Sequence, residues 1–170
     1  MNLKFIFAVF LLSISNVCLA LSTDKDKPMT IEANSVEIDD KKGITVYRGN
    51  IDVRQGTMHV TGNTLVIERV DGKVKTVTVV GKPARYTQRP DNKKDDVVAT
   101  ARKLQVYPKR DLVRLERKAR ITQEGDTFTG NIIEYDNKND IIKAKGAISK
   151  TDTGAATGGR IRMTIQPDKK

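Results

Sequence analysis

The chain has one cysteine, one histidine and no tryptophan in 170 residues. Its cysteine is Cys18, so no disulfide can stabilise residues 19–170, which must be held together by an apolar core. A single histidine cannot supply a cysteine and histidine cluster for zinc, and the glycine patterns of a P-loop or a dinucleotide-binding fold are also missing. The sequence therefore predicts neither an enzyme nor a bound cofactor or metal.

Aromatic side chains are also scarce beyond residue 20, where the sequence has only Tyr47, Tyr86, Tyr107, Phe128 and Tyr135. β-Proteins that bind single-stranded nucleic acid stack the bases on exposed rings. Tyr47, Phe128 and Tyr135 fall at the apolar positions of their segments, where a ring would point away from solvent. The sequence therefore argues against a nucleic-acid partner.

Long hydrophobic runs occur once, at the N-terminus. Lys4 precedes an apolar run over residues 5–14, which is too short to span a bilayer. Cys18 and Ala20 then place small residues three and one positions before a cleavage point after Ala20. We expect residues 1–20 to be a cleaved signal peptide and residues 21–170 to form one periplasmic domain. Lipid attachment at Cys18 is disfavoured because the preceding Val17 is not small.

Basic residues outnumber acidic ones, which gives a formal net charge of +10. For an exported protein, this charge favours partners such as anionic lipid, phosphorylated glycolipid or acidic polysaccharide. The acids are interspersed with the bases, however, so solubility alone also explains the charge.

Strict alternation of apolar and polar residues dominates the rest of the chain, for example in the segments MTIEANSVEID (29–39) and NIDVRQ (50–55). Turn signals such as Asp71-Gly72 separate these segments about every 8–12 residues. Alternation with period two and frequent Val, Ile and Thr are typical of half-buried strands. The pattern predicts an all-β protein.

The alternating pattern occurs twice, at an offset of 68 residues. Residues 55–63 read QGTMHVTGN and residues 123–131 read QEGDTFTGN, and apolar positions match without a gap over some 30 residues. Internal repeats of this kind stack because each leaves one apolar face open. We expect tandem repeats at roughly 29–88 and 97–151, joined by a long hairpin turn at residues 87–96.

The repeat also resolves one ambiguous segment. Residues 109–120 space Leu112, Leu115 and Ala119 like one face of a helix, but the equivalent residues of the first copy read GITVYRGN, a poor helix sequence. Residues 111–115 are therefore predicted to form a strand. His59 lies between two apolar residues and is expected to point outward, and the strand carboxylates are expected to pair with Lys or Arg.

The segments DKPMTIEANSVEID, VYRGNIDVRQGTMHVTGNTLVI, GKPARY and LERKARITQEGDTFTGNIIEY resemble the OstA-like family of lipopolysaccharide-transport proteins. The resemblance covers about residues 25–150. The sequence departs from the family pattern at ERKAR (116–120), where a turn like TGNA is expected, and this leaves the turn before Ala119 in doubt.

The resemblance implies a twisted, incompletely closed antiparallel β-jelly roll of about sixteen strands that holds the acyl chains of lipopolysaccharide (lipid A) in an apolar groove. It also implies head-to-tail homo-oligomers, in which edge strands pair between copies. By the same edge-strand pairing, the filament would join an inner-membrane anchor protein to an outer-membrane translocon. We expect the N-terminal strand and a last strand in RIRMTIQP (160–167) to form the joining edges.

Two kinds of observation select the candidate lipid-binding residues. The resemblance places Met29, Ile31, Tyr86 and Val106 in the lipid-contacting region. Alternation adds a further set of interior positions: Val36, Ile38, Val60, Leu65, Leu104, Leu115, Ile121 and Phe128. An alternative remains open, in which the protein is a periplasmic binding module or chaperone that holds anionic glycan or lipid on its basic surface.

Overall fold

The computed structural model describes residues 23–90, 93–146, 148–150 and 156–166. Short 3-10 turns occupy Thr23–Asp26 (η1) and Pro108–Arg110 (η2), and the other regular elements are strands. The strands are β1 (Met29–Glu32), β2 (Ser35–Asp39), β3 (Ile44–Gln55), β4 (Met58–Val70), β5 (Lys73–Gln88), β6 (Val97–Tyr107), β7 (Leu112–Gln123), β8 (Asp126–Asp136), β9 (Ile141–Lys145), β10 (Ile148–Lys150), β11 (Ala156–Gly158) and β12 (Arg162–Thr164).

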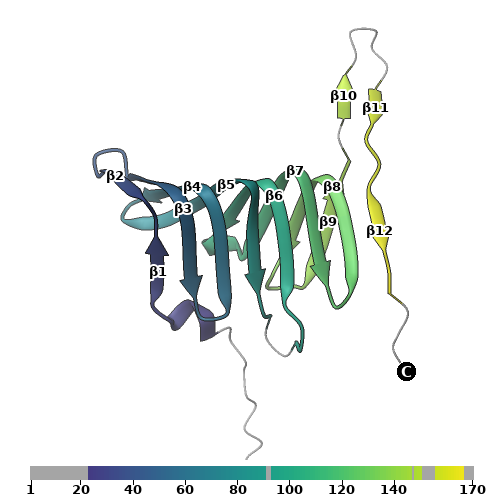
Figure 1. Ribbon diagram of the computed structural model, residues 1–170, viewed down its shortest axis with the longest axis horizontal. Helices are drawn as coiled ribbons and strands as arrows, with labels where there is room; N and C mark the ends of the chain where they lie inside the picture. Colours follow the sequence, from purple (N-terminus) through teal and green to yellow (C-terminus); the bar gives the residue numbers. More distant parts are fainter. Residues whose placement is uncertain (1–22, 91–92, 147, 151–155, 167–170) are drawn as a thin grey trace, which may run out of the picture.

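Ten of these strands form one antiparallel sheet in which β3 to β8 follow one another as a meander (Figure 1). β1 and β2 both pair with β3 at one end of the sheet, and β9 and β12 both pair with β8 at the other end. The β10–β11 hairpin forms a separate two-stranded sheet, which Figure 1 shows extending away from the main sheet. The sheet does not close on itself.

The pairing register shifts near the middle of each of the five strands β3 to β7. Shifts occur between Arg48 and Ile51, Thr61 and Thr64, Val80 and Ala84, Thr100 and Lys103, and Glu116 and Ala119. Bulges at neighbouring positions bend a sheet along a line. The sheet is thereby folded into two arms: the first arm contains β2 and β9, and the second contains β1 and β12.

The bulges of β3 and β7 lie 68 residues apart, at the offset of the repeat. In β3 the bulge contains Gly49 and Asn50, with φ of 80° and 47°. In β7 the equivalent residues are Arg117 and Lys118, whose φ values of 64° and 56° also lie in the left-handed region. The segment before Ala119 therefore keeps the backbone shape of its counterpart although it has neither glycine nor asparagine.

One apolar core fills the space between the two arms. Its buried side chains come from β3 to β8 on both sides of the bend, and are almost all aliphatic or alanine. Strand alternation explains the arrangement, because residues two apart share a face. The register shift at the bend lets residues on both sides of it point into the space between the arms. The outer faces of the arms consequently carry the polar residues.

Several expectations from the sequence can be compared with this fold. Residues 112–123 form a strand, which confirms the interpretation from the repeat. Gln88 pairs with Val97, so a hairpin joins β5 to β6 as expected, but Thr87 and Gln88 belong to β5 and not to the turn. The expected sixteen strands are not confirmed, because segments on the two arms are halves of continuous bent strands. The predicted signal peptide lies outside the described residues. Within the described part of the chain, no helix is long and apolar enough to cross a membrane.

Candidate functional site

The apolar interior between the arms contains most of the residues that the sequence selected. Six of them are buried: Val60, Leu65, Tyr86, Leu104, Leu115 and Ile121. Ile31, Val106 and Phe128 are partly buried and pack against this core. Burial raises the pKa of the Tyr86 hydroxyl, which stays neutral and donates a hydrogen bond to Gln88. These nine residues line one continuous interior that runs from β1 to β8.

Met29, Val36 and Ile38 are exposed, so the expectation that they lie inside the packed interior does not hold for the single chain. Ile38 is 61% exposed. Alternation assigned Val36 and Ile38 to the correct face, because they pair with Tyr47 and Thr45, which face the interior. They are exposed because β2 is an edge strand, and no other strand of the described residues covers that end of the interior.

The opposite end of the sheet is also apolar and uncovered. β12 pairs with β8 through Met163 and Phe128, as expected for a last strand in residues 160–167, although Pro167 lies outside the described residues. Ile161, Met163 and Ile165 are each about half exposed or more, and so is Ile141 at the start of β9. The interior therefore has an apolar end at β1 and β2 and a second at β9 and β12.

The free ends of the two arms face each other opposite the bend, across the core that they enclose, and we call this side of the sheet the mouth. Near its C-terminal end, Asp140 of the first arm accepts a hydrogen bond of 2.7 Å from Nε2 of Gln123 in the second arm. Lys93 Nζ lies 3.3 Å from Asp140 and 3.2 Å from Glu124. The hydrogen bond from Gln123, helped by Lys93, holds the pKa of Asp140 below its ordinary value, despite partial burial. Lys93, Gln123, Glu124 and Asp140 form a polar contact that we call the clasp.

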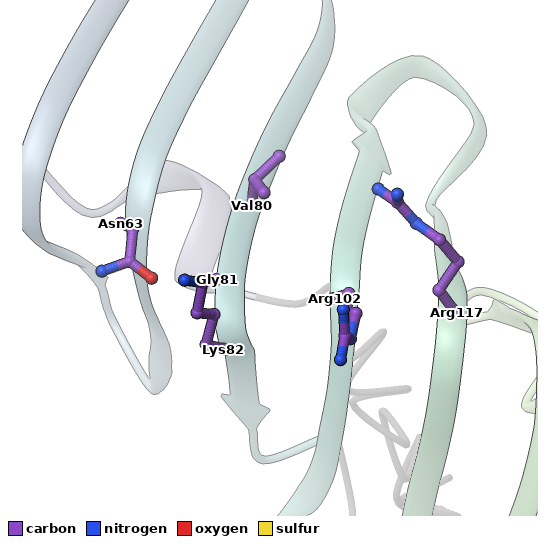
Figure 2. Close-up of a pocket in the computed structure, with 6 residues that line it drawn as sticks. All are labelled: Asn63, Val80, Gly81, Lys82, Arg102 and Arg117. Carbon is purple, nitrogen blue, oxygen red and sulfur yellow. The ribbon is translucent and has the colours of Figure 1, made fainter.

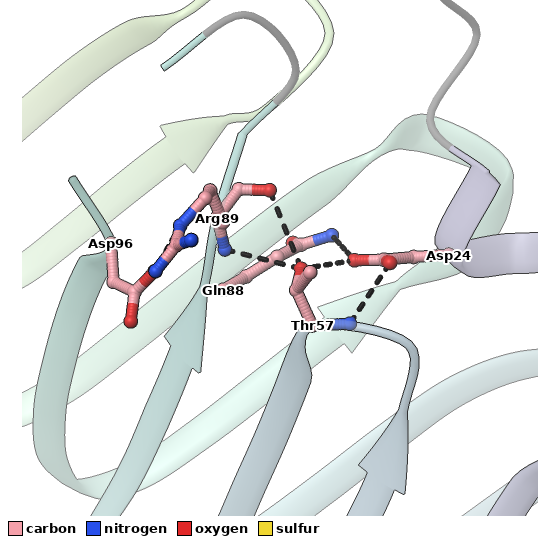
Figure 3. Close-up of polar contacts among 5 residues, drawn as sticks. All are labelled: Asp24, Thr57, Gln88, Arg89 and Asp96. Atoms are coloured by element: carbon pink, nitrogen blue, oxygen red, sulfur yellow. Dashed lines mark hydrogen bonds and ion pairs between the residues drawn. The ribbon is translucent and has the colours of Figure 1, made fainter. Parts of the chain in front are cut away.

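A second polar cluster holds the N-terminal segment against the second arm (Figure 3). Asp24 of η1 accepts hydrogen bonds from the backbone and hydroxyl of Thr57 and from the Gln88 amide, at 2.9 Å from the Thr57 nitrogen and 3.1 Å from Gln88 Nε2. A Cβ at Gly56 would lie 2.1 Å from an Asp24 oxygen, so glycine is needed there. Burial raises the pKa of Asp24, but these hydrogen bonds outweigh it and the net pKa is lowered. Asp24 thus fixes the chain five residues before β1 begins.

Sequence reasoning missed both polar clusters, because their residues lie in turns or at strand ends and meet only when the sheet is folded. The outer face follows the expectations more closely. His59 is half-buried on the outer side, where its Nε2 lies 2.8 Å from Asp52. Glu37 pairs with Arg48, and Glu134 pairs with Arg114. Among the described residues, no group of three His, Cys, Asp or Glu is placed to hold a metal ion.

Together these features define a class of protein: an open, bent antiparallel sheet with an aliphatic interior, uncovered at both ends. The family model described as "LptA/(LptD N-terminal domain) LPS transport protein" matches residues 30–141. The chain belongs to this family, which confirms the resemblance seen in the sequence.

Individual relatives agree with the family assignment. The chain is 40% identical to the lipopolysaccharide export system protein LptH of Pseudomonas aeruginosa over 157 residues, which cover 92% of this chain and 89% of that protein. It is 28% identical to the lipopolysaccharide export system protein LptA of Escherichia coli K12, over 79% of this chain and 74% of that protein.

A solved structure supports the fold. The crystal structure of LptH from P. aeruginosa, described as the LptA-homologous periplasmic component of the lipopolysaccharide transport device, superposes with a TM-score of 0.75. The match has 38% sequence identity and covers 85% of this chain and 99% of that chain. The all-β, open architecture is therefore shared with a protein of lipopolysaccharide transport.

Proposed function

We propose that this protein is a periplasmic carrier that binds lipopolysaccharide with its acyl chains between the two arms. It passes the lipid from an inner-membrane transport complex to an outer-membrane translocon, and it has no catalytic step. The observation that carries the proposal is the continuous aliphatic interior, which ends at exposed residues such as Ile38 and Met163. Family membership and the names of the relatives give independent support.

Binding requires the arms to separate, because side chains such as Leu104 and Leu115 have no exposed surface in this state. The clasp opposes separation only weakly, since its ion pairs are exposed to solvent and screened by it. Each acyl CH₂ buried contributes about 0.8 kcal/mol, so a few methylenes outweigh the clasp. Acyl chains can therefore open the mouth, while the sugars of the lipid stay in solvent outside it.

We further propose that copies assemble head to tail. β1 and β2 pair with β3 at one end of the sheet, and β9 and β12 pair with β8 at the other, so these four strands are the edge strands of the described sheet. Edge strands of this kind pair with strands of another chain. Two different ends that meet without closing a ring produce a filament. Pairing of the ends would cover Ile38 of one copy and Met163 of the next, and would join their interiors.

Site-specific photo-crosslinking in cells tests the lipid path. A photoreactive residue is placed at Ile38, at Tyr86 or at His59, which is the control because it lies on the outer face near Asp52. We expect lipopolysaccharide to be captured at Ile38 and Tyr86 and not at His59. Capture at His59 alone, or at none of the three, would replace the interior path with binding to the outer surface.

A second experiment tests entry through the mouth. The double variant Gln123→Cys/Asp140→Cys carries the only two cysteines of the chain after Cys18, so a short cleavable thiol crosslinker can tether the arms. We expect the tethered protein to bind lipopolysaccharide more slowly than the same protein after cleavage of the tether. The control is the single variant Gln123→Cys with the same reagent. Equal rates before and after cleavage would show that lipid enters at the ends instead.

A further inference from the structure

The outer side of the bend carries a row of cations that neither the apolar interior nor the strand edges explain. Lys82 of β5, Arg102 of β6, and Arg117 and Lys118 of β7 are all exposed along this line. Within the described part of the chain, the side chains of these four residues make no hydrogen bond or ion pair. Lys103, the neighbour of Arg102, does have one, to Glu116 at 3.3 Å. We call the four unpaired cations the basic ridge.

A hollow of about 370 Å³ lies on the basic ridge and is lined by Asn63, Val80, Gly81, Lys82, Arg102 and Arg117 (Figure 2). In the figure, the side chain of Arg117 extends from β7 toward the neighbouring strand that carries Arg102. A second hollow, of about 550 Å³, is lined by Lys118, the neighbour of Arg117 in the chain, and by Arg120 and Arg160. Volumes of this size suit a small molecule rather than a single ion.

Acidic side chains are nearly absent from these surfaces. A third hollow, which shares Asn63 and Lys82 with the first, contains Asp52, the only carboxylate that lines any of the three. Asp52 is already engaged by Arg54 at 2.9 Å and by His59 at 2.8 Å. The positive charge of the basic ridge is therefore not compensated by the described residues around it.

The two copies of the repeat differ sharply at this place. Residues 48–52 contain one arginine and one aspartate, whereas the equivalent residues 116–120 contain one glutamate and three basic residues. Arg117 and Lys118 also keep the left-handed backbone of Gly49 and Asn50, a conformation that is unfavourable for residues other than glycine. The second copy thus carries both strain and unpaired charge at one spot of the outer surface.

We propose that the basic ridge is a binding site for phosphate groups, separate from the interior. Arginine guanidinium groups bind phosphate through two parallel hydrogen bonds, and Lys82 adds a compact charge beside them. The Asn63 side chain lines the same hollow and can donate a further hydrogen bond. The phosphate groups come either from a soluble molecule or from the headgroup of a lipid.

The test uses inorganic pyrophosphate in isothermal titration calorimetry at low salt, and vesicles of phosphatidylcholine with and without phosphatidic acid in co-sedimentation. The variant Arg102→Gln/Arg117→Gln/Lys118→Gln removes three charges of the basic ridge. The control Lys41→Gln/Lys73→Gln/Lys138→Gln removes three exposed charges at turns away from the bend. We expect the ridge variant to lose about tenfold or more in affinity, while the control changes by less than about twofold.

The two arms of the experiment separate the sources of phosphate. Pyrophosphate binding alone assigns the basic ridge to soluble phosphates, and binding to phosphatidic acid vesicles alone assigns it to lipid headgroups. No binding of either probe by the wild-type protein would overturn the proposal. Equal losses in the ridge variant and the control would also overturn it, because net charge alone would then explain binding. Arg117→Gly/Lys118→Asn, which suits the local backbone, gives a second ridge variant that keeps the fold.

Discussion

Replacing Arg117 by glycine and Lys118 by asparagine should stabilise the protein. Both residues have left-handed φ values, and the substitutions copy the Gly49-Asn50 sequence that occupies the same bulge in β3. The left-handed conformation costs a residue other than glycine about 1–2 kcal/mol. Glycine avoids this cost, but it loses more conformational entropy on folding, which cancels part of the gain. Asparagine tolerates the conformation better than lysine. We expect a net gain of about 1 kcal/mol in the free energy of unfolding.

Urea denaturation followed by circular dichroism measures this gain, with the slope m as a check that the transition itself is unchanged. For a domain of this size, 1 kcal/mol corresponds to about 2–4 °C in Tm. The control is Arg117→Gln/Lys118→Gln, which removes the same two charges and keeps the unfavourable backbone. If the control gains as much stability as the glycine and asparagine variant, relief of charge repulsion is the cause and the backbone argument is wrong.

Three further predictions follow from burial and hydrogen bonding. Ile121→Ala, at a fully buried position, should cost about 2–5 kcal/mol in urea denaturation, whereas Ile38→Ala should cost well under 1 kcal/mol because Ile38 is exposed. Ile38→Asp should weaken lipopolysaccharide capture while leaving Tm nearly unchanged, and a large fall in Tm would contradict this. The lowered pKa of Asp24 implies stability that is present above about pH 4 and lost at lower pH, so the difference in stability between wild type and Asp24→Ala should shrink as the pH falls below about 4. A difference that stays constant over that fall in pH would contradict the assignment of the carboxylate.

The sequence predicted the strands and the inward-facing residues well, because strand alternation is a local property. Leu65, Leu104 and Leu115 are buried as expected, and the match between the two copies overrode the helical spacing of residues 109–120. Exposure at Val36 and Ile38 could not be predicted, since alternation reveals the face of a residue and not whether a neighbour covers that face.

The bend and the polar contacts at the mouth could not be predicted from the sequence, for a different reason. A bulge depends on register shifts between strands, and these become visible only when the pairing partners are known. The clasp joins Lys93, Gln123 and Asp140, which lie up to 47 positions apart in the chain (140 minus 93). Each of these residues reads as an ordinary loop or strand-end residue, and only the folding of the sheet into two arms brings them together.

The contrast between the two copies of the repeat separates the constraints on the two sides of the sheet. Toward the interior, the offset of 68 residues matches Val53 with Ile121 and Leu65 with Ile133, all buried. These pairs exchange one aliphatic side chain for another, because packing between the arms admits only apolar groups of similar size. On the outer side of the bend, the same offset matches Asp52 with Arg120, a reversal of charge. The interior therefore restricts both copies alike, whereas the outer side of the second copy is free to acquire the basic ridge.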